Sequence, residues 1–106
     1  SNITEYTFKA AIKDYPVHFS KGNRNIAIGP FESFMKQLIP DGLLLQLDIY
    51  DTEGIFITSK KTTTKNGVCN IFLGEHFLKE GDYILKIKAA GFTKEFTKNI
   101  HGDTVK

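Results

Sequence analysis

Short runs in which apolar and polar residues alternate make up most of the chain between residues 41 and 100. The clearest run covers residues 43–50, where every second residue is a leucine or an isoleucine. A period of two is typical of a β-strand with one face in a hydrophobic core. The same pattern predicts further strands, at residues 6–12, 15–19, 26–28, 55–57, 68–73, 83–89 and 92–100.

Turn-forming residues separate these runs. Asn66-Gly67 is a strong hairpin signal, Asp51–Gly54 is a second hairpin turn, and Ala90-Gly91 turns the chain into its last strand. A break at Lys13-Asp14 divides the first two runs. Because Pro16 cannot donate to a strand ladder, the second run is predicted to be an edge strand.

The alternation also predicts which side chains face the core. Two later strands have inward positions at Cys69, Ile71, Leu73, Tyr83, Leu85 and Ile87. The inward face of the last strand is poorly specified, because Phe92, Phe96 and Ile100 share it with Lys94 and Lys98.

The segment 31–38 is the one ambiguous stretch. Phe31, Phe34, Met35 and Leu38 recur at helical spacing, but a helix of about two turns is marginal alone. We expect a connecting loop with one helical turn that caps an end of the fold. Its apolar cluster either plugs that end or forms a contact patch. Phe31, Phe34 and Met35 are therefore candidate interaction residues.

About seven short strands without a long helix predict an all-β fold, an antiparallel sandwich with a Greek-key connection. A chain of 106 residues is expected to form one domain. Residues 1–2 look like the remnant of a cleaved expression tag, and residues 101–106 are expected to be a tail or linker. Because Cys69 is the single cysteine, no intrachain disulfide can form.

Four segments resemble a known family: IPDG at 39–42, LQLDIYDTEG at 45–54, TKNGVCNIFL at 64–73 and LKEGDYILKI at 78–87. Their order resembles that of bacterial Ig-like domains of the invasin/intimin and macroglobulin types, over residues 25–100. The resemblance implies an Ig-like sandwich in which Tyr83 forms a tyrosine corner, its phenol bonding back to the backbone. The chain departs from the invasin type at residues 31–38, where a polar segment is usual.

Domains of this kind occur in adhesins, envelope protease inhibitors, phage tail and capsid proteins, and secretion or conjugation machines. The resemblance therefore implies a module of a larger assembly without selecting one function. It favours the cell envelope, the extracellular space or a virion over the cytoplasm.

Charge and hydropathy restrict the partners. A net charge of +2 and a pI near 8.6 are too mild to indicate nucleic-acid binding. No run approaches the roughly 20 apolar residues of a membrane helix, so no membrane span is expected in this segment.

Catalytic and metal-binding patterns are weak. The histidines His18, His76 and His101 lack the paired spacing typical of zinc ligands. A Cys69–His76 pair would need an exposed, activated thiolate, whereas Cys69 is expected to face inward. We therefore expect no enzyme activity, no metal and no cofactor.

Asp48, Asp51 and Glu53 cluster at a strand end and have two interpretations. Calcium prefers six to eight oxygen ligands, and this cluster lacks the spacing of a dedicated loop. Turn formation by Asp51 explains the cluster better.

Four lysines, Lys86, Lys88, Lys94 and Lys98, are expected on the last two paired strands. One interpretation is a basic face for an anionic partner. The other, which we favour, is solubility and protection of a sheet edge.

The sequence thus predicts a non-catalytic structural or interaction module that docks protein partners, including other copies of itself, through end loops or an exposed strand edge. The alternative is a carbohydrate- or ligand-binding β-module with exposed aromatic residues, for which Tyr50, Phe56 and Phe92 are the candidates.

Overall fold

The computed structural model describes residues 12–33, 39 and 41–102, and their regular secondary structure is entirely β-strand. The strands are β1 (Ile12–Asp14), β2 (Val17–Ser20), β3 (Asn25–Ile28), β4 (Glu32–Ser33), β5 (Leu44–Tyr50), β6 (Phe56–Thr63), β7 (Cys69–Phe72), β8 (Gly81–Ala89) and β9 (Phe92–Ile100).

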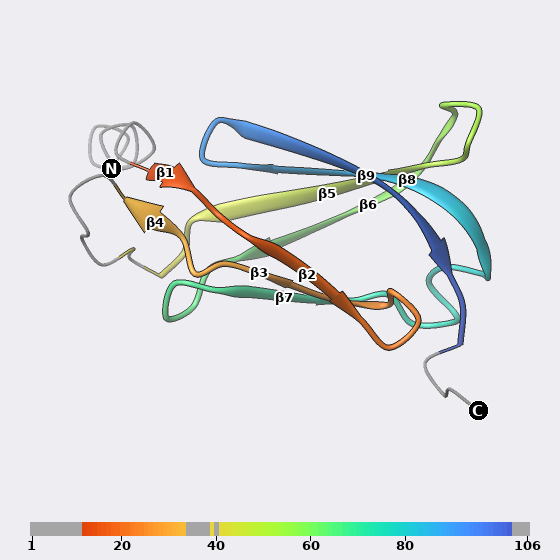
Figure 1. The fold of residues 1–106 in the computed structure, drawn as a ribbon, viewed down its shortest axis with the longest axis horizontal. Helices are drawn as coiled ribbons and strands as arrows, with labels where there is room; N and C mark the ends of the chain where they lie inside the picture. Colours follow the sequence, from red (N-terminus) through yellow and green to blue (C-terminus); the bar gives the residue numbers. More distant parts are fainter. Residues whose placement is uncertain (1–11, 34–38, 40, 103–106) are drawn as a thin grey trace.

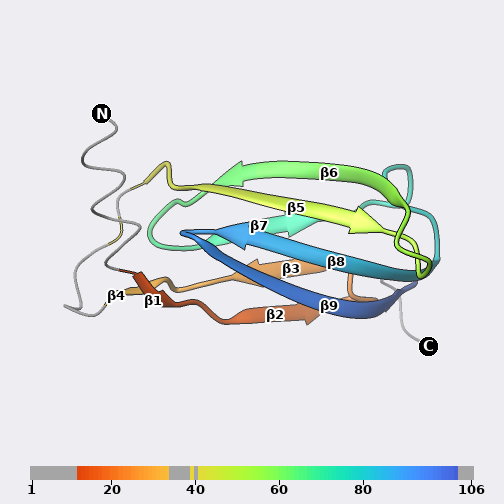
Figure 2. The same ribbon diagram turned by 90° about the horizontal axis from the view of Figure 1, so that it is seen from above.

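Seven of these strands form two antiparallel sheets that face each other (Figure 1). One sheet has the order β2-β3-β7 and the other the order β6-β5-β8-β9. The short pair β1-β4 lies at one end, and Figure 2, seen from above, shows the strands of one sheet overlying those of the other. The prediction of an all-β fold with about seven main strands is confirmed at this level.

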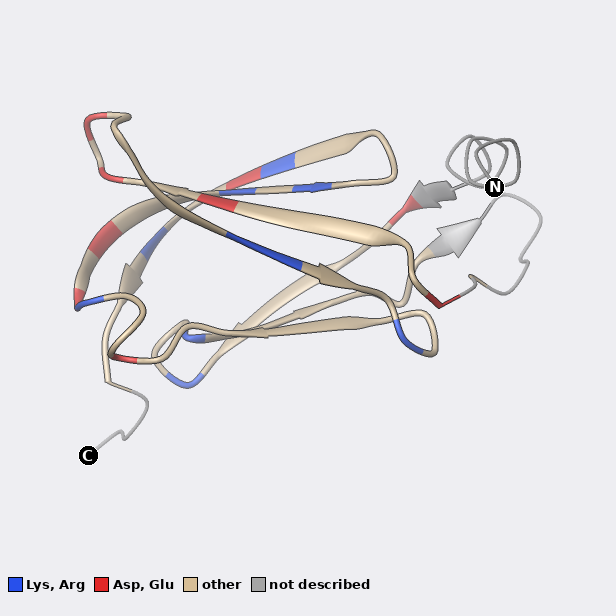
Figure 3. Ribbon diagram, turned by 180° about the vertical axis from the view of Figure 1, so that it is seen from behind, with Lys and Arg blue, Asp and Glu red and all other residues tan. Residues whose placement is uncertain are grey.

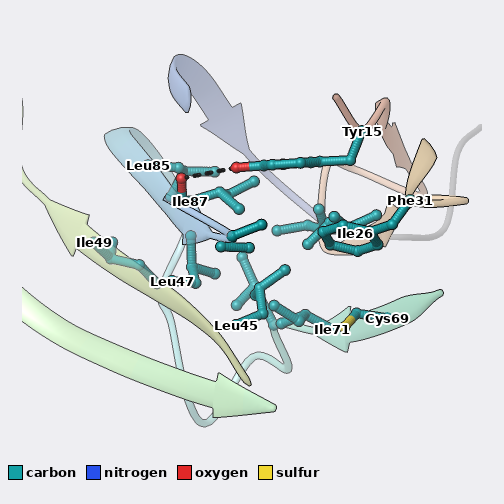
Figure 4. Packing of buried hydrophobic residues seen from close by; sticks show 14 of the residues in the cluster. Tyr15, Ile26, Phe31, Leu45, Leu47, Ile49, Cys69, Ile71, Leu85 and Ile87 are labelled. Carbon is teal, nitrogen blue, oxygen red and sulfur yellow. Dashed lines mark hydrogen bonds between the residues drawn. The ribbon is translucent and has the colours of Figure 1, made fainter. Parts of the chain in front are cut away.

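The core lies between the two sheets and follows the predicted alternation (Figure 4). Leu45, Leu47 and Ile49 of β5 are fully buried, because β5 is an inner strand of its sheet and this face of it packs on the opposite sheet. β7 contributes Cys69 and Ile71 from the opposite sheet. Full burial of a side chain of this size contributes about 1.5–3 kcal/mol, so these alternating positions fix which face of each strand turns inward.

Tyr15 connects the two layers. Its ring is fully buried and stacks on Phe31, with ring centroids 4.9 Å apart. Its hydroxyl lies 3.4 Å from the carbonyl oxygen of Ile87 and 3.2 Å from that of Phe92. The phenol therefore joins the segment between β1 and β2 to the β8–β9 hairpin of the other sheet.

The predicted turns at Asp51 and at Ala90-Gly91 are confirmed. The Asp51 carboxylate accepts hydrogen bonds from the amides of Glu53 and Ile55, both at 2.9 Å. Ala90 and Gly91 both have positive φ, as the tight turn of a two-residue hairpin requires.

The turn at Asn66-Gly67 has the expected geometry but an unexpected place. Both residues have positive φ, and Lys65 and Val68 exchange two backbone hydrogen bonds. However, β6 and β7 on either side belong to different sheets. The turn therefore carries the chain from one layer to the other.

The first strands differ from the prediction. Lys13 and Asp14 lie within β1, and the break falls instead at Tyr15-Pro16, where proline interrupts the ladder. The following strand, β2, is an edge strand as predicted. Residues 6–11 of the first predicted strand lie outside the described residues.

The strand predicted at residues 55–57 is longer and starts later than expected. β6 begins at Phe56 and continues through the polar residues Lys60 and Lys61 to Thr63. Alternation did not reveal this extension, because β6 is an edge strand beside β5 only and buries few apolar side chains.

The start of the predicted tail is tied to the sheets. The His101 amide donates to the Gly22 carbonyl at 3.1 Å, and the Gly102 amide donates to the Glu80 carboxylate at 3.1 Å. His101 therefore packs against the β2–β3 turn, and Gly102, which also lies close to Gly22, is bonded to Glu80 just before β8.

Candidate functional site

The four candidate lysines lie on β8 and β9, as predicted, but on opposite faces of the sheet. Lys86 and Lys88 alternate with the buried Leu85 and Ile87, so they project from the outer face. Lys94 pairs across the ladder with Ile87 and therefore shares the inner face of the sheet. Figure 3 shows positive residues spread over several strands and turns. A single basic face does not form.

The outer lysines each have an acidic neighbour. Lys88 Nζ lies 2.9 Å from a carboxylate oxygen of Asp48, and Lys86 Nζ lies 4.0 Å from Glu95. Lys86 also lies over the ring of Tyr50, 4.8 Å from its centroid. Their charge is therefore partly compensated within the fold.

The inner lysines cover aromatic rings along the β9 side of the core. Lys94 lies 5.0 Å from the Tyr15 ring centroid and 2.8 Å from an Asp14 carboxylate oxygen. Lys98 lies 4.5 Å from the ring centroid of Phe19. Long side chains of this type shield apolar surface while their charged ends stay near water. Lysine at these inward positions thus closes the open side between β9 and β2.

The apolar candidates of the segment 31–38 have one described member. Phe31 is 6 % exposed and stacks on Tyr15, so its side chain belongs to the core, as the plug interpretation expects. Phe34 and Met35 lie outside the described residues.

The groups weighed for catalysis are dispersed. Cys69 is buried, and burial raises the pKa of its thiol to about 11, far from the activated thiolate that nucleophilic catalysis needs. His18, His76 and His101 are exposed on separate segments. In the described part of the chain no three His, Cys, Asp or Glu residues are grouped to hold a metal ion.

The most prominent exposed apolar surface lies where β6 begins. Ile55, Phe56 and Ile57 are three consecutive residues with 60, 55 and 43 % exposure. We call them the β6 tip. A run of exposed apolar residues on an ordered strand is unusual unless it meets a partner.

Aromatic and charged side chains adjoin the β6 tip on the outer face. The Tyr50 and Phe56 rings pack edge to face, with centroids 5.7 Å apart, and Lys86 lies over Tyr50. The structure therefore brings together two of the three aromatic candidates. Phe92 lies apart from them, beside Tyr15.

The backbone of β6 adds a second feature to this surface. β6 pairs with β5 on one side and forms the edge of its sheet. The register shifts between Ile49 and Tyr50, where β6 carries one extra residue, Ile57. Bulges and lysines commonly protect such edges from unspecific pairing, and Lys60 and Lys61 occupy the centre of β6.

Of the β6 tip, only Phe56 was singled out from the sequence, as an aromatic candidate of the carbohydrate- or ligand-binding alternative; Ile55 and Ile57 were not. Ile55 and Ile57 fit an alternating strand, and alternation alone assigns such residues to a core. Phe56 between them did indicate an exposed apolar side chain. Three successive apolar residues cannot all face one side of a strand, so at least one of them must face away from the core.

A shallow cavity of about 350 Å³ lies on the outer face of the three-stranded sheet. Asn25 and Phe72 face each other across the β3–β7 ladder, as do Ala27 and Asn70. Phe72 is strongly exposed. Side-chain amides beside an open aromatic ring form a polar surface with one apolar wall.

Within the described residues there is no helix with the length and apolarity needed to cross a membrane. Comparisons of the chain with protein-family models, with curated proteins and with solved structures found no match.

Proposed function

We propose that this chain is a non-catalytic interaction module with an Ig-like sandwich architecture, and that it docks an extended segment of a partner protein on the edge of β6. The partner segment adds to the sheet as a further strand. This is the recognition mode in which backbone hydrogen bonds provide affinity and alternate side chains provide specificity.

The strand order supports the Ig-like part of this proposal. In chain order, β2, β3 and β7 correspond to strands A, B and E, while β5, β6, β8 and β9 correspond to C, C′, F and G. Ig-type domains likewise place C, F and G in one sheet, with C′ added beside C in some of them. The Tyr83 hydroxyl donates to the Lys79 carbonyl at 2.8 Å, as a tyrosine corner does.

The observation that carries the docking proposal is the β6 tip on an unpaired edge. Ile55 is 60 % exposed, and among the residues that the structure describes no strand pairs with the outer edge of β6. Lys61 lies further along β6 and is exposed. We therefore expect a partner strand with apolar residues opposite the tip and acidic residues opposite the lysines.

Selection of peptides from a display library against the full chain tests this proposal. Enriched peptides are expected to be extended, apolar at one end and acidic at the other. The double variant Ile55→Ser/Phe56→Ser should weaken their binding by more than tenfold, because burial of large apolar side chains dominates such contacts.

Leu44→Ser is the matched control, because Leu44 is similarly exposed but lies at the opposite end of β5. Equal loss of binding in the control and in the double variant would contradict docking at β6. Sedimentation velocity on the chain alone distinguishes a second copy as the partner. A dimer that dissociates in the double variant would identify one.

A second candidate function is carbohydrate binding at the cavity beside Phe72. Sugars stack their apolar faces on aromatic rings and bond amides through their hydroxyls, and Asn25, Asn70 and Phe72 supply both kinds of contact. A glycan array with Phe72→Ala tests it. Signals lost in Phe72→Ala but kept in Phe92→Ala would support this function, and a blank array would count against it.

A further inference from the structure

Arg24 is the largest polar side chain in the interior. It lies in the β2–β3 turn and is 1 % exposed. Its Nη1 donates to the carbonyl oxygens of Leu73 and Leu78, at 2.8 and 2.7 Å, and its Nε donates to that of His101 at 2.8 Å. The guanidinium thus ties three segments of the chain together.

These bonds leave the charge of Arg24 uncompensated. Its bonded acceptors are all neutral carbonyl groups, and no described carboxylate forms an ion pair with it. Nη2 is the one buried side-chain nitrogen or oxygen in the described residues that has no hydrogen-bond partner. A buried donor without a partner is destabilising, so this position favours an acceptor, above all an anionic one.

Arg24 also lines a cavity of about 450 Å³, in which such an acceptor could lie. The other lining residues are Lys60, Phe72, Gly74, Glu75, His76 and Phe77. The cavity joins the β2–β3 turn, the centre of β6 and the loop after β7. That turn and that loop lie at the end of the molecule opposite β1 and β4 (Figure 1).

The walls of the cavity combine positive charge with apolar surface. Lys60 Nζ donates to the Phe72 carbonyl at 2.8 Å and lies 4.8 Å from the centroid of the Phe77 ring. Glu75 contributes the one negative charge of the lining. With two basic side chains, one carboxylate and a neutral His76, the lining has a formal net charge of +1, which suits a single negative charge.

We propose that this cavity binds a small monocarboxylate with an apolar stem. The carboxylate takes the two N–H groups of Arg24 Nη2 and the ammonium of Lys60, while the stem lies against Phe72 and Phe77. A phosphate fits less well because it carries more charge and the remaining Arg24 donors are occupied by carbonyls. This proposal does not rest on docking at the β6 edge, although Lys60 belongs to both surfaces.

Access to Nη2 requires a change in the cavity wall, because the atom is buried. Residues 74–77 are the part of the wall that connects two strands without belonging to either sheet. The amides of Phe77 and Leu78 both bond the Gly74 carbonyl, at 3.0 and 2.9 Å. Binding should therefore perturb this loop first.

A titration of the full ¹⁵N-labelled chain with sodium butyrate, followed by NMR, tests the site. Butyramide, which is neutral and of the same shape, and sodium chloride at equal ionic strength are the ligand controls. Butyrate should shift the Arg24 Nε–H signal and the amides of Glu75, His76 and Phe77 in a saturable way. Butyramide and chloride should not.

Two pairs of variants sharpen the result. Lys60→Met should weaken butyrate binding about fivefold, the scale of one solvent-screened charge contact, while its neighbour Lys61→Met should leave it unchanged. Glu75→Gln should strengthen binding by a similar factor, while Glu53→Gln, in the distant β5–β6 turn, should not. All four variants leave Arg24 in place, and their spectra report whether the fold is intact.

Three outcomes would overturn the proposal. These are equal shifts with butyrate and butyramide, equal affinities within each pair of variants, and tighter binding of inorganic phosphate than of butyrate. The first two would make Arg24 a purely structural residue, and the third would replace the carboxylate by a different anion.

Discussion

At the scale of single residues, Asp48 is a buried carboxylate that is held from two sides. The Gln46 amide donates to it at 2.7 Å, and Lys88 lies 2.9 Å away. Burial acts to raise the pKa of Asp48, but hydrogen bonds from Gln46 and Lys88 and the charges of Lys88 and Lys61 outweigh it, so the pKa is lowered. The outer face of the sheet therefore contains a charge pair where simple alternation indicated a solvated position.

The lowered pKa of Asp48 sets the sign of an acid effect. The contribution of the ionised Asp48 to the free energy of unfolding is fully present above the unfolded-state pKa of about 4. It is lost as the pH falls through the lower folded-state pKa. Asp48→Asn should reduce the free energy of unfolding at pH 7 by about 1–2 kcal/mol and flatten its decline below pH 4. Urea unfolding from pH 2 to 7 measures this, with Glu53→Gln as control. Parallel pH profiles for both variants would contradict it.

Tyr15 makes stability depend on pH in the opposite direction, with a loss at alkaline pH. Burial, with a smaller contribution from the charge of Asp14, raises its pKa to about 12. The contribution of the protonated Tyr15 hydroxyl to the free energy of unfolding is fully present below the unfolded-state pKa of about 10. It is lost as the pH rises toward 12. Tyr15→Phe should cost about 1–2 kcal/mol at pH 7 and reduce the loss of stability above pH 10. Tyr50→Phe is the control, and equal stability of the two variants would refute the role given to the Tyr15 hydroxyl.

At the scale of elements, alternation predicted the strands that are buried on one face. β5, β7 and β8 have the expected inward residues because each packs a row of aliphatic side chains on the opposite sheet. β6 and β9 were harder to predict. Both are edge strands, where burial is incomplete and residues such as Lys94 and Lys98 can face inward over aromatic rings.

The conformation of the β2–β3 turn depends on a close approach between its backbone and that of residues 101–102. Gly22 has a φ of 71° and is buried against the backbone of His101 and Gly102, whose carbonyl oxygens an added Cβ would overlap. Nothing in the local sequence marks this contact, because His101 is far away along the chain. The same contact holds His101 and Gly102 against the β2–β3 turn, although both lie at the start of the segment predicted to be a tail or linker.

At Gly22 an added Cβ meets two costs, the strain of a positive φ and the overlap with neighbouring backbone. Comparing Gly22→Ala with Gly91→Ala, in the β8–β9 turn, separates them. Both glycines have positive φ, but a Cβ at Gly91 would meet nothing within 4 Å. Gly91→Ala should lower the free energy of unfolding by about 1–2 kcal/mol, the cost of left-handed backbone. Gly22→Ala should lower it by about 1–3 kcal/mol more, as overpacking does. Thermal unfolding measures both, and equal losses would show that the approach of His101 is not tight.

At the scale of the whole molecule, the sequence predicted the number of strands but not their division between sheets. Asn66-Gly67 appeared to join two strands of one hairpin, whereas it connects the two layers. This division places β6 at an edge, beside the loop that follows β7. The edge position of the β6 tip and the Arg24 cavity both depend on this division. Local pattern marked the apolar run at Phe56 but predicted neither its place at an edge nor the cavity.

The molecule protects its sheet edges unevenly. On one side, Lys94, Lys98 and the bond between Asn23 and the Asn99 carbonyl, at 2.8 Å, cover the opening between β9 and β2. On the other side, Lys60 reaches from β6 to β7, while the β6 tip stays exposed. This asymmetry is the central reason for assigning partner docking to β6.

Amide hydrogen exchange of the chain with and without a selected peptide tests this assignment most directly. Strand addition forms new backbone hydrogen bonds, so exchange should slow by at least tenfold at the amides of Phe56–Thr63 that face away from β5, while β9 stays unchanged. Unchanged exchange throughout β6, with protection appearing on β9 or elsewhere, would contradict the account.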